Sequence, residues 1–269
     1  MIALHRCPKE TDVPDYAPGT PSWVDLGSPD PDASVRFYGG LFGWNATEPG
    51  PVQETGGYRM FQQDDARIGG LMPLMQEGQP PAWSTYVSVA DADATAAAVT
   101  ANGGSVLAEP MDITDIGRMA IFADPAGAVF GVWEPRTFAG ADLVNAPNSL
   151  CWNELATRDV EGAKAFYPAV FGWEPGSAPL GPDDEYTVWN LDGRPAGGMM
   201  AMGDGFPAEV PPHWNVCFAV ADADAVATAA EGLGGAVDVP PTDIPIGRFA
   251  VLRDPHGASF AVMQFPEDR

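Results

Sequence analysis

Two acidic residues, Asp25 and Glu154, stand where the sequence could place a carboxyl group against aromatic rings. Each comes two residues after a tryptophan, Trp23 or Trp152, in a short run of strand character. Alternate residues of a strand share one face, so each acid is expected beside its tryptophan. Poor solvation there would raise the pKa of the carboxyl group and let it act as an acid or base, or pair with a cationic ligand. In the structural alternative, each carboxylate accepts backbone hydrogen bonds or pairs with an arginine.

Other residues that commonly carry catalysis are scarce. The chain has three histidines and three cysteines, His5, His213, His256, Cys7, Cys151 and Cys217. These residues are common metal ligands, so few metal sites can be assembled, and no disulfide framework is expected. Cys151 and Cys217 are expected to be small core residues, although a Cys217 thiol that faced inward could be modified. No GxSxG motif with a usable histidine, no GxGxxG motif and no P-loop occurs.

The overall charge excludes several classes of partner. The chain has 37 acidic and 13 basic side chains, a net charge of −24 and a pI near 4.1. Thirteen basic side chains cannot neutralise a row of phosphates against this negative charge. Neither nucleic acid nor a membrane surface is therefore expected as a partner. No apolar run approaches about 18 residues, and the N-terminus lacks the apolar segment of a secretory signal. A cytoplasmic protein is therefore predicted.

A tandem repeat runs through the chain. Ser22–Leu26 aligns with Cys151–Leu155 at an offset of 129 residues, and FYGGLFGW at Phe37–Trp44 aligns with FYPAVFGW at Phe166–Trp173. Further matches follow in order, as expected for a duplication. They include the pairs Gly69-Gly70 and Gly197-Gly198, and the turns Asp124–Gly127 and Asp254–Gly257. The predicted organisation is an N-terminal arm (1–19), a first domain (20–136), a linker (137–147) and a second domain (148–269).

A weaker repeat lies within each half. Residues 22–44 are expected to form a strand, a turn and a helix, and residues 83–104 repeat that order before a stop at Gly103-Gly104. Strand-like runs separated by Gly, Pro and Asp follow each helix. The Asp-Ala-Asp runs that begin at Asp91 and Asp222 are expected at helix starts, where negative charge is favourable. Each half therefore contains two βαβββ modules, and the chain contains four.

The paired modules, the two FGW helices and the two DPxG turns resemble the vicinal oxygen chelate superfamily. That superfamily holds glyoxalases, bleomycin-resistance proteins, fosfomycin-resistance enzymes and extradiol dioxygenases. The resemblance covers about residues 20–136 and 148–266 and implies an α+β fold, with four βαβββ modules forming two tandem glyoxalase-like cupped β-barrel domains. More narrowly, the chain resembles tandem glyoxalase-like proteins of actinobacteria. These are often labelled hydroxylases, and some lie in aromatic polyketide antibiotic pathways.

The superfamily usually holds a divalent ion at positions that the resemblance assigns to this chain. These positions are Trp23, Ser84 and Gly131 in the first half, and Trp152, Asn215 and Ala261 in the second. They do not form a strong ligand set, so neither a metal nor another cofactor is expected. One alternative is a displaced metal site formed by Glu154 and His213. The other interpretation places His213 at the rim of the barrel.

The positions expected to face into the barrels are aromatic and rich in methionine, which suits a flat organic ligand. The predicted ligand-binding residues are Trp23, Tyr58, Phe61, Met72, Ser84, Trp152, Tyr186, Trp189, Met200, His213, Asn215, Arg118 and Arg248. Alternatively, the apolar residues pack the barrels shut. The two arginines could instead hold loops or pair with carboxylates rather than grip a ligand oxygen.

The leading hypothesis is a metal-independent protein that binds an aromatic, polyketide-like small molecule. A stronger version of the hypothesis has the protein modify that molecule, with Asp25 or Glu154 as catalytic acid or base. Whether it is an enzyme stays open, and a hydroxylase, another oxidoreductase or a lyase-like enzyme would fit the resemblance. The first alternative is a binding protein that sequesters an aromatic or cationic drug, as bleomycin-resistance proteins do. The second is a metal-dependent glyoxalase or dioxygenase. A monomer or a homodimer is expected, and either barrel could be the functional one.

Overall fold

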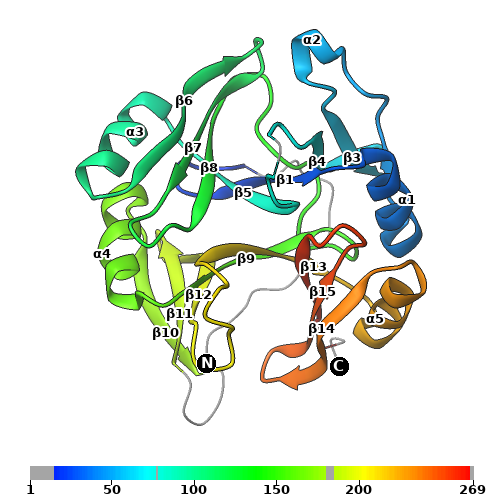
Figure 1. Cartoon of the computed structure of the whole chain (residues 1–269). Coiled ribbons are helices and arrows are strands. Elements are labelled where there is room, and N and C mark those ends of the chain that lie inside the picture. The colour runs from blue at the N-terminus through cyan, green and yellow to red at the C-terminus, as the bar shows by residue number, and fades with distance from the viewer. Residues whose placement is uncertain (1–14, 77, 180–184, 267–269) are drawn as a thin grey trace.

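The computed structural model describes residues 15–76, 78–179 and 185–266. Within these residues the chain forms two eight-stranded mixed sheets with helices between and beside them (Figure 1). The predicted α+β fold of four βαβββ modules in two tandem glyoxalase-like domains is confirmed. Residues 1–14 of the predicted arm, with His5 and Cys7, lie outside the described residues.

The first sheet joins two modules through an antiparallel contact between their first strands, β1 and β5. Its strand order is β2-β3-β4-β1-β5-β8-β7-β6. The first module comprises β1 (Pro21–Ser28), α1 (Pro31–Phe42), β2 (Asn45–Ala46), α2 (Val52–Thr55), β3 (Arg59–Gln63) and β4 (Ala66–Pro73). The second comprises β5 (Ala82–Ser88), α3 (Ala92–Ala101), β6 (Ser105–Ile113), β7 (Gly117–Ala123) and β8 (Val129–Pro135).

The second sheet repeats this topology, with the order β10-β11-β12-β9-β13-β16-β15-β14. Its first module comprises β9 (Leu150–Thr157), α4 (Val160–Phe171), β10 (Glu174–Pro179), β11 (Glu185–Leu191) and β12 (Arg194–Ala201). Its second comprises β13 (His213–Ala219), α5 (Ala223–Gly232), β14 (Ala236–Ile244), β15 (Gly247–Arg253) and β16 (Ser259–Gln264). The duplication seen in the sequence is therefore a duplication of the sheet.

Local signals in the sequence set the helix ends. Asp91 and Asp222 are N-caps, each accepting a hydrogen bond from a backbone N–H three residues on, as the Asp-Ala-Asp runs predict. The glycine of each FGW motif, Gly43 or Gly172, ends its helix in the left-handed conformation, at φ 76° and 72°. No described helix is long and apolar enough to cross a membrane.

The two halves share their cores rather than each burying its own. The helix α1 lies beside α5 of the second half, and α4 lies beside α3 of the first (Figure 1). Tyr38 of α1 donates a hydrogen bond to Asp254 at 3.3 Å, and Tyr167 of α4 donates to Asp124 at 3.0 Å. The tyrosine of each FGW helix therefore binds the DPxG turn of the opposite half.

These shared cores cover one face of each sheet, and we call the opposite face the inner face. On the first sheet, the inner face carries Trp23 opposite Tyr86 and Asp25 opposite Ser84. On the second sheet, the corresponding pairs are Trp152 opposite Cys217 and Glu154 opposite Asn215. The predicted placement of each acid on the same face as its tryptophan is confirmed.

Two of the predicted ligand-binding residues do not belong to the inner faces. Phe61 and Trp189 are fully buried in the two shared cores, against the ring of Tyr38 or Tyr167 respectively. Phe61 lies opposite Gly69, whose Cβ position faces Val24 and Trp83 of the core. The prediction that they face inward is wrong, because each aromatic stands on the opposite side of the pleat from the acid.

Candidate functional site

Asp25 is the centre of a buried hydrogen-bond network on the first inner face. Its residue is only 5% exposed, and Tyr86 and Ser84 donate hydrogen bonds to its carboxyl group. Burial raises the pKa of Asp25 to about 7, and the two hydrogen bonds offset only part of that effect. The carboxyl group is therefore protonated in a large fraction of molecules at neutral pH.

Tyr58, in the segment before β3, makes a separate hydrogen bond beside Asp25. Trp23 Nε1 donates a hydrogen bond to the Tyr58 hydroxyl at 2.8 Å. Burial and the negative charge of Asp25 raise the pKa of Tyr58 well above its usual value. A Cβ at Gly70 would lie 1.8 Å from this hydroxyl, so only glycine leaves room for it. The repeated Gly-Gly pair was the sequence signal for this site, and Gly70, the second glycine of the pair, faces the Tyr58 hydroxyl.

Aromatic residues from outside the two modules cover the first inner face. Phe138 of the linker packs edge-on against Trp23, with 4.9 Å between ring centroids. Trp133 Nε1 donates a hydrogen bond to the carbonyl oxygen of Phe138 at 2.7 Å. Tyr16 of the arm donates to the carbonyl oxygen of Ala141 at 2.9 Å. Phe138 and Tyr16 are buried in one cluster with Trp23, Tyr86 and Trp133. We call Tyr16 and Phe138, which cover this face, the plug. The sequence did not predict it, because the arm and linker have no periodic pattern.

The second inner face repeats the tryptophan, tyrosine and acid. Trp152 Nε1 donates a hydrogen bond to the Tyr186 hydroxyl at 2.8 Å, and Tyr186 in turn donates to Glu154. Burial of the carboxyl group raises the pKa of Glu154, and the hydrogen bond from Tyr186 opposes that rise. A Cβ at Gly198 would lie 1.7 Å from the Tyr186 hydroxyl, so this glycine matches Gly70.

The second inner face is nevertheless more accessible than the first. Trp152 and Glu154 are half-buried, whereas Trp23 and Asp25 are buried. Cys217 replaces Tyr86 on the central strand, so the large ring that packs over Gly131 in the first sheet has no counterpart over Ala261. The second acid therefore has a raised pKa in a residue that is less completely buried than Asp25.

The other predicted residues of the second site lie around Glu154. Asn215 stands opposite Glu154 on β13, and its amide nitrogen is 3.3 Å from His213 Nε2. His213 Nδ1 is 2.8 Å from the carbonyl oxygen of Pro211. Met200 lies two residues beyond Gly198 on β12, and Met72 holds the matching position two residues beyond Gly70 in the first sheet.

The residues at the superfamily's metal-binding positions do not fit a divalent ion. Trp23 and Trp152 use their ring N–H groups as donors to tyrosine, so they offer no lone pair. The Cβ position of Gly131 is taken up by the Tyr86 ring. Across residues 15–76, 78–179 and 185–266, no three His, Cys, Asp or Glu side chains are grouped so as to hold a metal ion. Glu154 and His213 thus have no third ligand of these types in the described chain.

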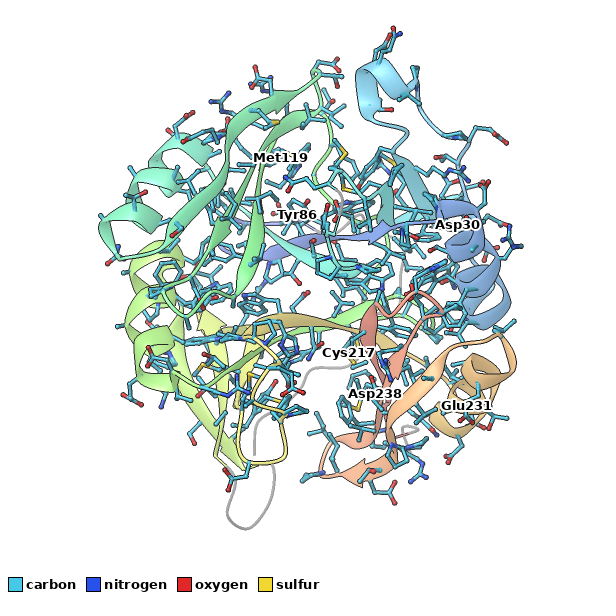
Figure 2. All side chains as sticks on the ribbon, in the orientation of Figure 1. Asp30, Tyr86, Met119, Cys217, Glu231 and Asp238 are labelled. Carbon is cyan, nitrogen blue, oxygen red and sulfur yellow. The ribbon has the colours of Figure 1, made fainter. Side chains whose placement is uncertain are left out.

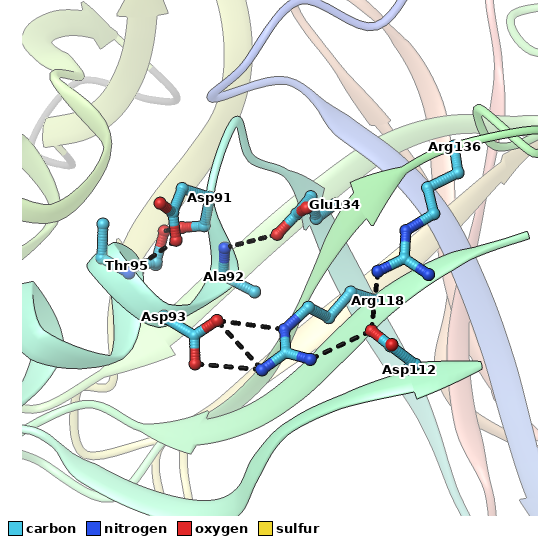
Figure 3. Close-up of polar contacts among 9 residues, drawn as sticks. Asp91, Ala92, Asp93, Thr95, Asp112, Arg118, Glu134 and Arg136 are labelled. Carbon is cyan, nitrogen blue, oxygen red and sulfur yellow. Dashed lines mark hydrogen bonds and ion pairs between the residues drawn. The ribbon is translucent and has the colours of Figure 1, made fainter. Parts of the chain in front are cut away.

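Arg118 and Arg248 lie on the helix-covered side of the sheets. Arg118 binds Asp93 of α3 and Asp112 of β6, with nitrogen to oxygen distances of 2.9 and 3.0 Å (Figure 3). Arg248 makes the matching pairs with Asp224 and Asp243 at 2.6 and 2.8 Å. The prediction that they line the ligand site is wrong, and their alternative role in pairing with carboxylates is the observed one.

The chain belongs to the Glyoxalase/Bleomycin resistance protein/Dioxygenase superfamily, whose family model matches residues 20–132 and again residues 149–262. It is 42% identical over 270 residues to the anthracycline biosynthesis protein DnrV of Streptomyces peucetius, covering 94% of this chain and 95% of DnrV. It is 41% identical to DauV of Streptomyces sp. strain C5, another anthracycline biosynthesis protein, with the same coverage.

Solved structures share the fold at low sequence identity. The 2,3-dioxygenase LapB of Pseudomonas sp. KL28 superposes with a TM-score of 0.64 at 15% identity, covering 94% of this chain and 95% of LapB. The Mn(II)-bound glyoxalase of Novosphingobium aromaticivorans gives a TM-score of 0.62 at 19% identity, covering 92% of this chain and 82% of that one. These similarities support the two-domain fold and carry no inference about the reaction.

Proposed function

We propose that this protein binds a planar, aromatic polyketide-like small molecule at the second inner face and exchanges a proton with it through Glu154, without a resident metal ion. The observation that carries the proposal is the contrast between the two acids. Both are desolvated and hydrogen-bonded to a tyrosine, but Asp25 is buried whereas Glu154 is only partly buried. A general acid or base must reach its substrate, which favours Glu154 over Asp25.

The residues around Glu154 suit an aromatic ligand. Trp152, Phe249 and Met263 belong to one cluster with Cys217 and Ala261, and Trp152 and Phe249 are half-buried there. Partly exposed aromatic rings favour stacking, and methionine adapts to an irregular outline. DnrV and DauV are named as anthracycline biosynthesis proteins, which supports a polyketide-like ring system as the ligand.

The proton chemistry follows from the Tyr186 hydrogen bond. In its charged form, Glu154 accepts this bond and would take a proton from a phenol, or from a carbon beside a carbonyl group, in the ligand. In its neutral form it would return a proton, and its raised pKa brings both forms closer to neutral pH. Trp152 holds the Tyr186 hydroxyl in place, so the donor to Glu154 is fixed before a ligand arrives.

Ligand binding and turnover can be measured separately. Hydroxylated anthraquinones and cationic aromatic drugs are titrated against the reduced full chain while tryptophan fluorescence is recorded, and the incubated ligand is then analysed by mass spectrometry. The proposal expects quenching and a changed product. A ligand that binds tightly and is recovered unchanged would instead support sequestration, the alternative function for this fold.

Metal independence has its own test. Purified protein is assayed for Zn, Mn, Fe, Ni and Co by mass spectrometry, and turnover is measured before and after dialysis against a chelator. We expect less than stoichiometric metal and unchanged turnover. A stoichiometric metal whose removal abolishes turnover, and whose return restores it, would overturn this part of the proposal.

A further inference from the structure

Two thiols meet on the second inner face, beside the site described above. The Cys151 and Cys217 sulfur atoms are 3.8 Å apart, and the Cys151 thiol also donates to the Cys217 carbonyl oxygen at 3.3 Å. Figure 2 labels Cys217 on the second sheet and its counterpart Tyr86 on the first. Both cysteines belong to the cluster that holds Trp152 and Phe249.

A β-bulge brings the two thiols together. Trp152 stands opposite Cys217 and Leu150 stands opposite Phe218, so Cys151 is the extra residue of β9. The first sheet has the same bulge at Ser22, between the pairs Trp23–Tyr86 and Pro21–Val87. Serine and tyrosine therefore fill the two positions in the first sheet, and cysteines fill both in the second. The pair is a local feature of the second inner face rather than a requirement of the fold.

We propose that Cys151 and Cys217 form a dithiol that is reversibly oxidised to a disulfide by small-molecule disulfides of the glutathione type. Cys151 is half-buried and Cys217 is 5% exposed, so an incoming disulfide meets Cys151 first. The Cys151 thiolate attacks one sulfur of the small disulfide, forming a mixed disulfide and releasing one small thiol. Cys217 then attacks the Cys151 sulfur and releases the second small thiol.

This exchange is balanced. The protein loses two protons and two electrons, which leave on the two small thiols, and the added reagent is the only oxidant. Hydrogen bonding with Cys151, burial and the nearby Glu154 charge raise the pKa of Cys217 well above its usual value, so Cys217 does not act first. Its direct contact with the Cys151 sulfur lets it complete the second step.

Oxidation is tested on the folded full chain carrying Cys7→Ser, which removes the third cysteine of the sequence. Reduced protein is incubated with oxidised glutathione, free thiols are trapped with an alkylating reagent, and intact mass and peptide maps are recorded. We expect loss of the mass of two hydrogens, no alkylation at either residue, and a Cys151–Cys217 peptide pair that dithiothreitol separates.

The matched control is Cys151→Ser, which gives the second sheet the residue that the first sheet has at its bulge. It should form no intramolecular link, and Cys217 should stay free because the reagent cannot reach it. Oxidation should also raise the Tm of the Cys7→Ser protein, since the link closes a long loop, and leave that of the control unchanged. The proposal does not depend on which ligand the second inner face binds.

Two outcomes would overturn the proposal. In one, both thiols are still alkylated after prolonged incubation, although urea-unfolded protein forms the link under the same conditions. In the other, the reaction stops at a mixed disulfide on Cys151 with Cys217 free. Loss of turnover in Glu154 variants bears on the proposed function alone, so the two proposals fail separately.

Discussion

The two inner faces show what a duplicated fold keeps and what it changes. Each has a tryptophan that donates to a tyrosine hydroxyl, a glycine that leaves room for that hydroxyl, and an acid two residues after the tryptophan on the same strand. In the first sheet, Tyr86, Phe138 and Tyr16 add bulk over this arrangement and bury it. In the second, Cys217 stands in place of Tyr86 and Glu154 is half-buried. The same framework thus buries one acid and leaves the other partly exposed.

Exchanging each carboxyl group for its amide is the strongest way to break this comparison. Glu154→Gln should lower turnover of a modified ligand by about 10²–10⁴-fold, the usual contribution of a general acid or base. The change keeps the side-chain shape and the partner Tyr186. The measurement is kcat on the substrate identified by product analysis. Asp25→Asn is the matched control and should keep turnover near that of the parent; equal losses in both variants would contradict the assignment.

The buried acid of the first sheet should control stability instead. Asp25 has a pKa of about 7 in the folded chain, against 3.8 for an aspartate free in water. Between these values the folded state holds a proton that the unfolded state lacks, so rising pH favours unfolding. The free energy of unfolding should fall by about 4 kcal/mol in total as pH rises, and the fall should be complete above pH 7.

Urea unfolding of the parent and Asp25→Asn at several pH values measures this effect. The stability of the variant relative to the parent should rise between about pH 4 and pH 7 and then level off. Glu154→Gln serves as the comparison from the more exposed site and should show a smaller change. A flat difference for Asp25→Asn would show that Asp25 is charged in the folded chain.

Opening the plug tests why the first face is closed. Phe138→Ala removes a buried ring packed on Trp23, which should cost about 3 kcal/mol of unfolding free energy. It should also increase the quenching of tryptophan fluorescence by acrylamide relative to the parent, because Trp23 loses the ring that covers it. Unchanged stability, or unchanged quenching, would mean that other residues close this face.

The smallest effect is expected from closing the second face. Cys217→Tyr with Ala261→Gly copies the Tyr86–Gly131 pair of the first sheet into the second. The added ring should weaken ligand binding by about tenfold, since it takes up space beside Trp152. Fluorescence titration measures the affinity, with Ala261→Gly alone as the control. Equal affinity in both variants would place the ligand elsewhere.

Much of the fold was predictable from local patterns. The offset of 129 residues, the FGW helices and the DPxG turns indicated four βαβββ modules, because helix caps and strand alternation depend on near neighbours in the chain. The same alternation placed Trp23 with Asp25 and Trp152 with Glu154. The inward placement of Phe61 and Trp189 was wrong for the same reason: each lies three residues after Tyr58 or Tyr186, and alternation puts residues three apart on opposite faces, here in the shared cores.

The sequence by itself determined the duplicated α+β fold and the pairing of each acid with a tryptophan. The tertiary structure decided which acid is accessible. That outcome depends on contacts between distant segments, Tyr16 and Phe138 with the first sheet, and on the replacement of Tyr86 by Cys217. Solvation of a carboxyl group, and hence its pKa, is set by everything packed around it in space, which no local pattern in the chain records.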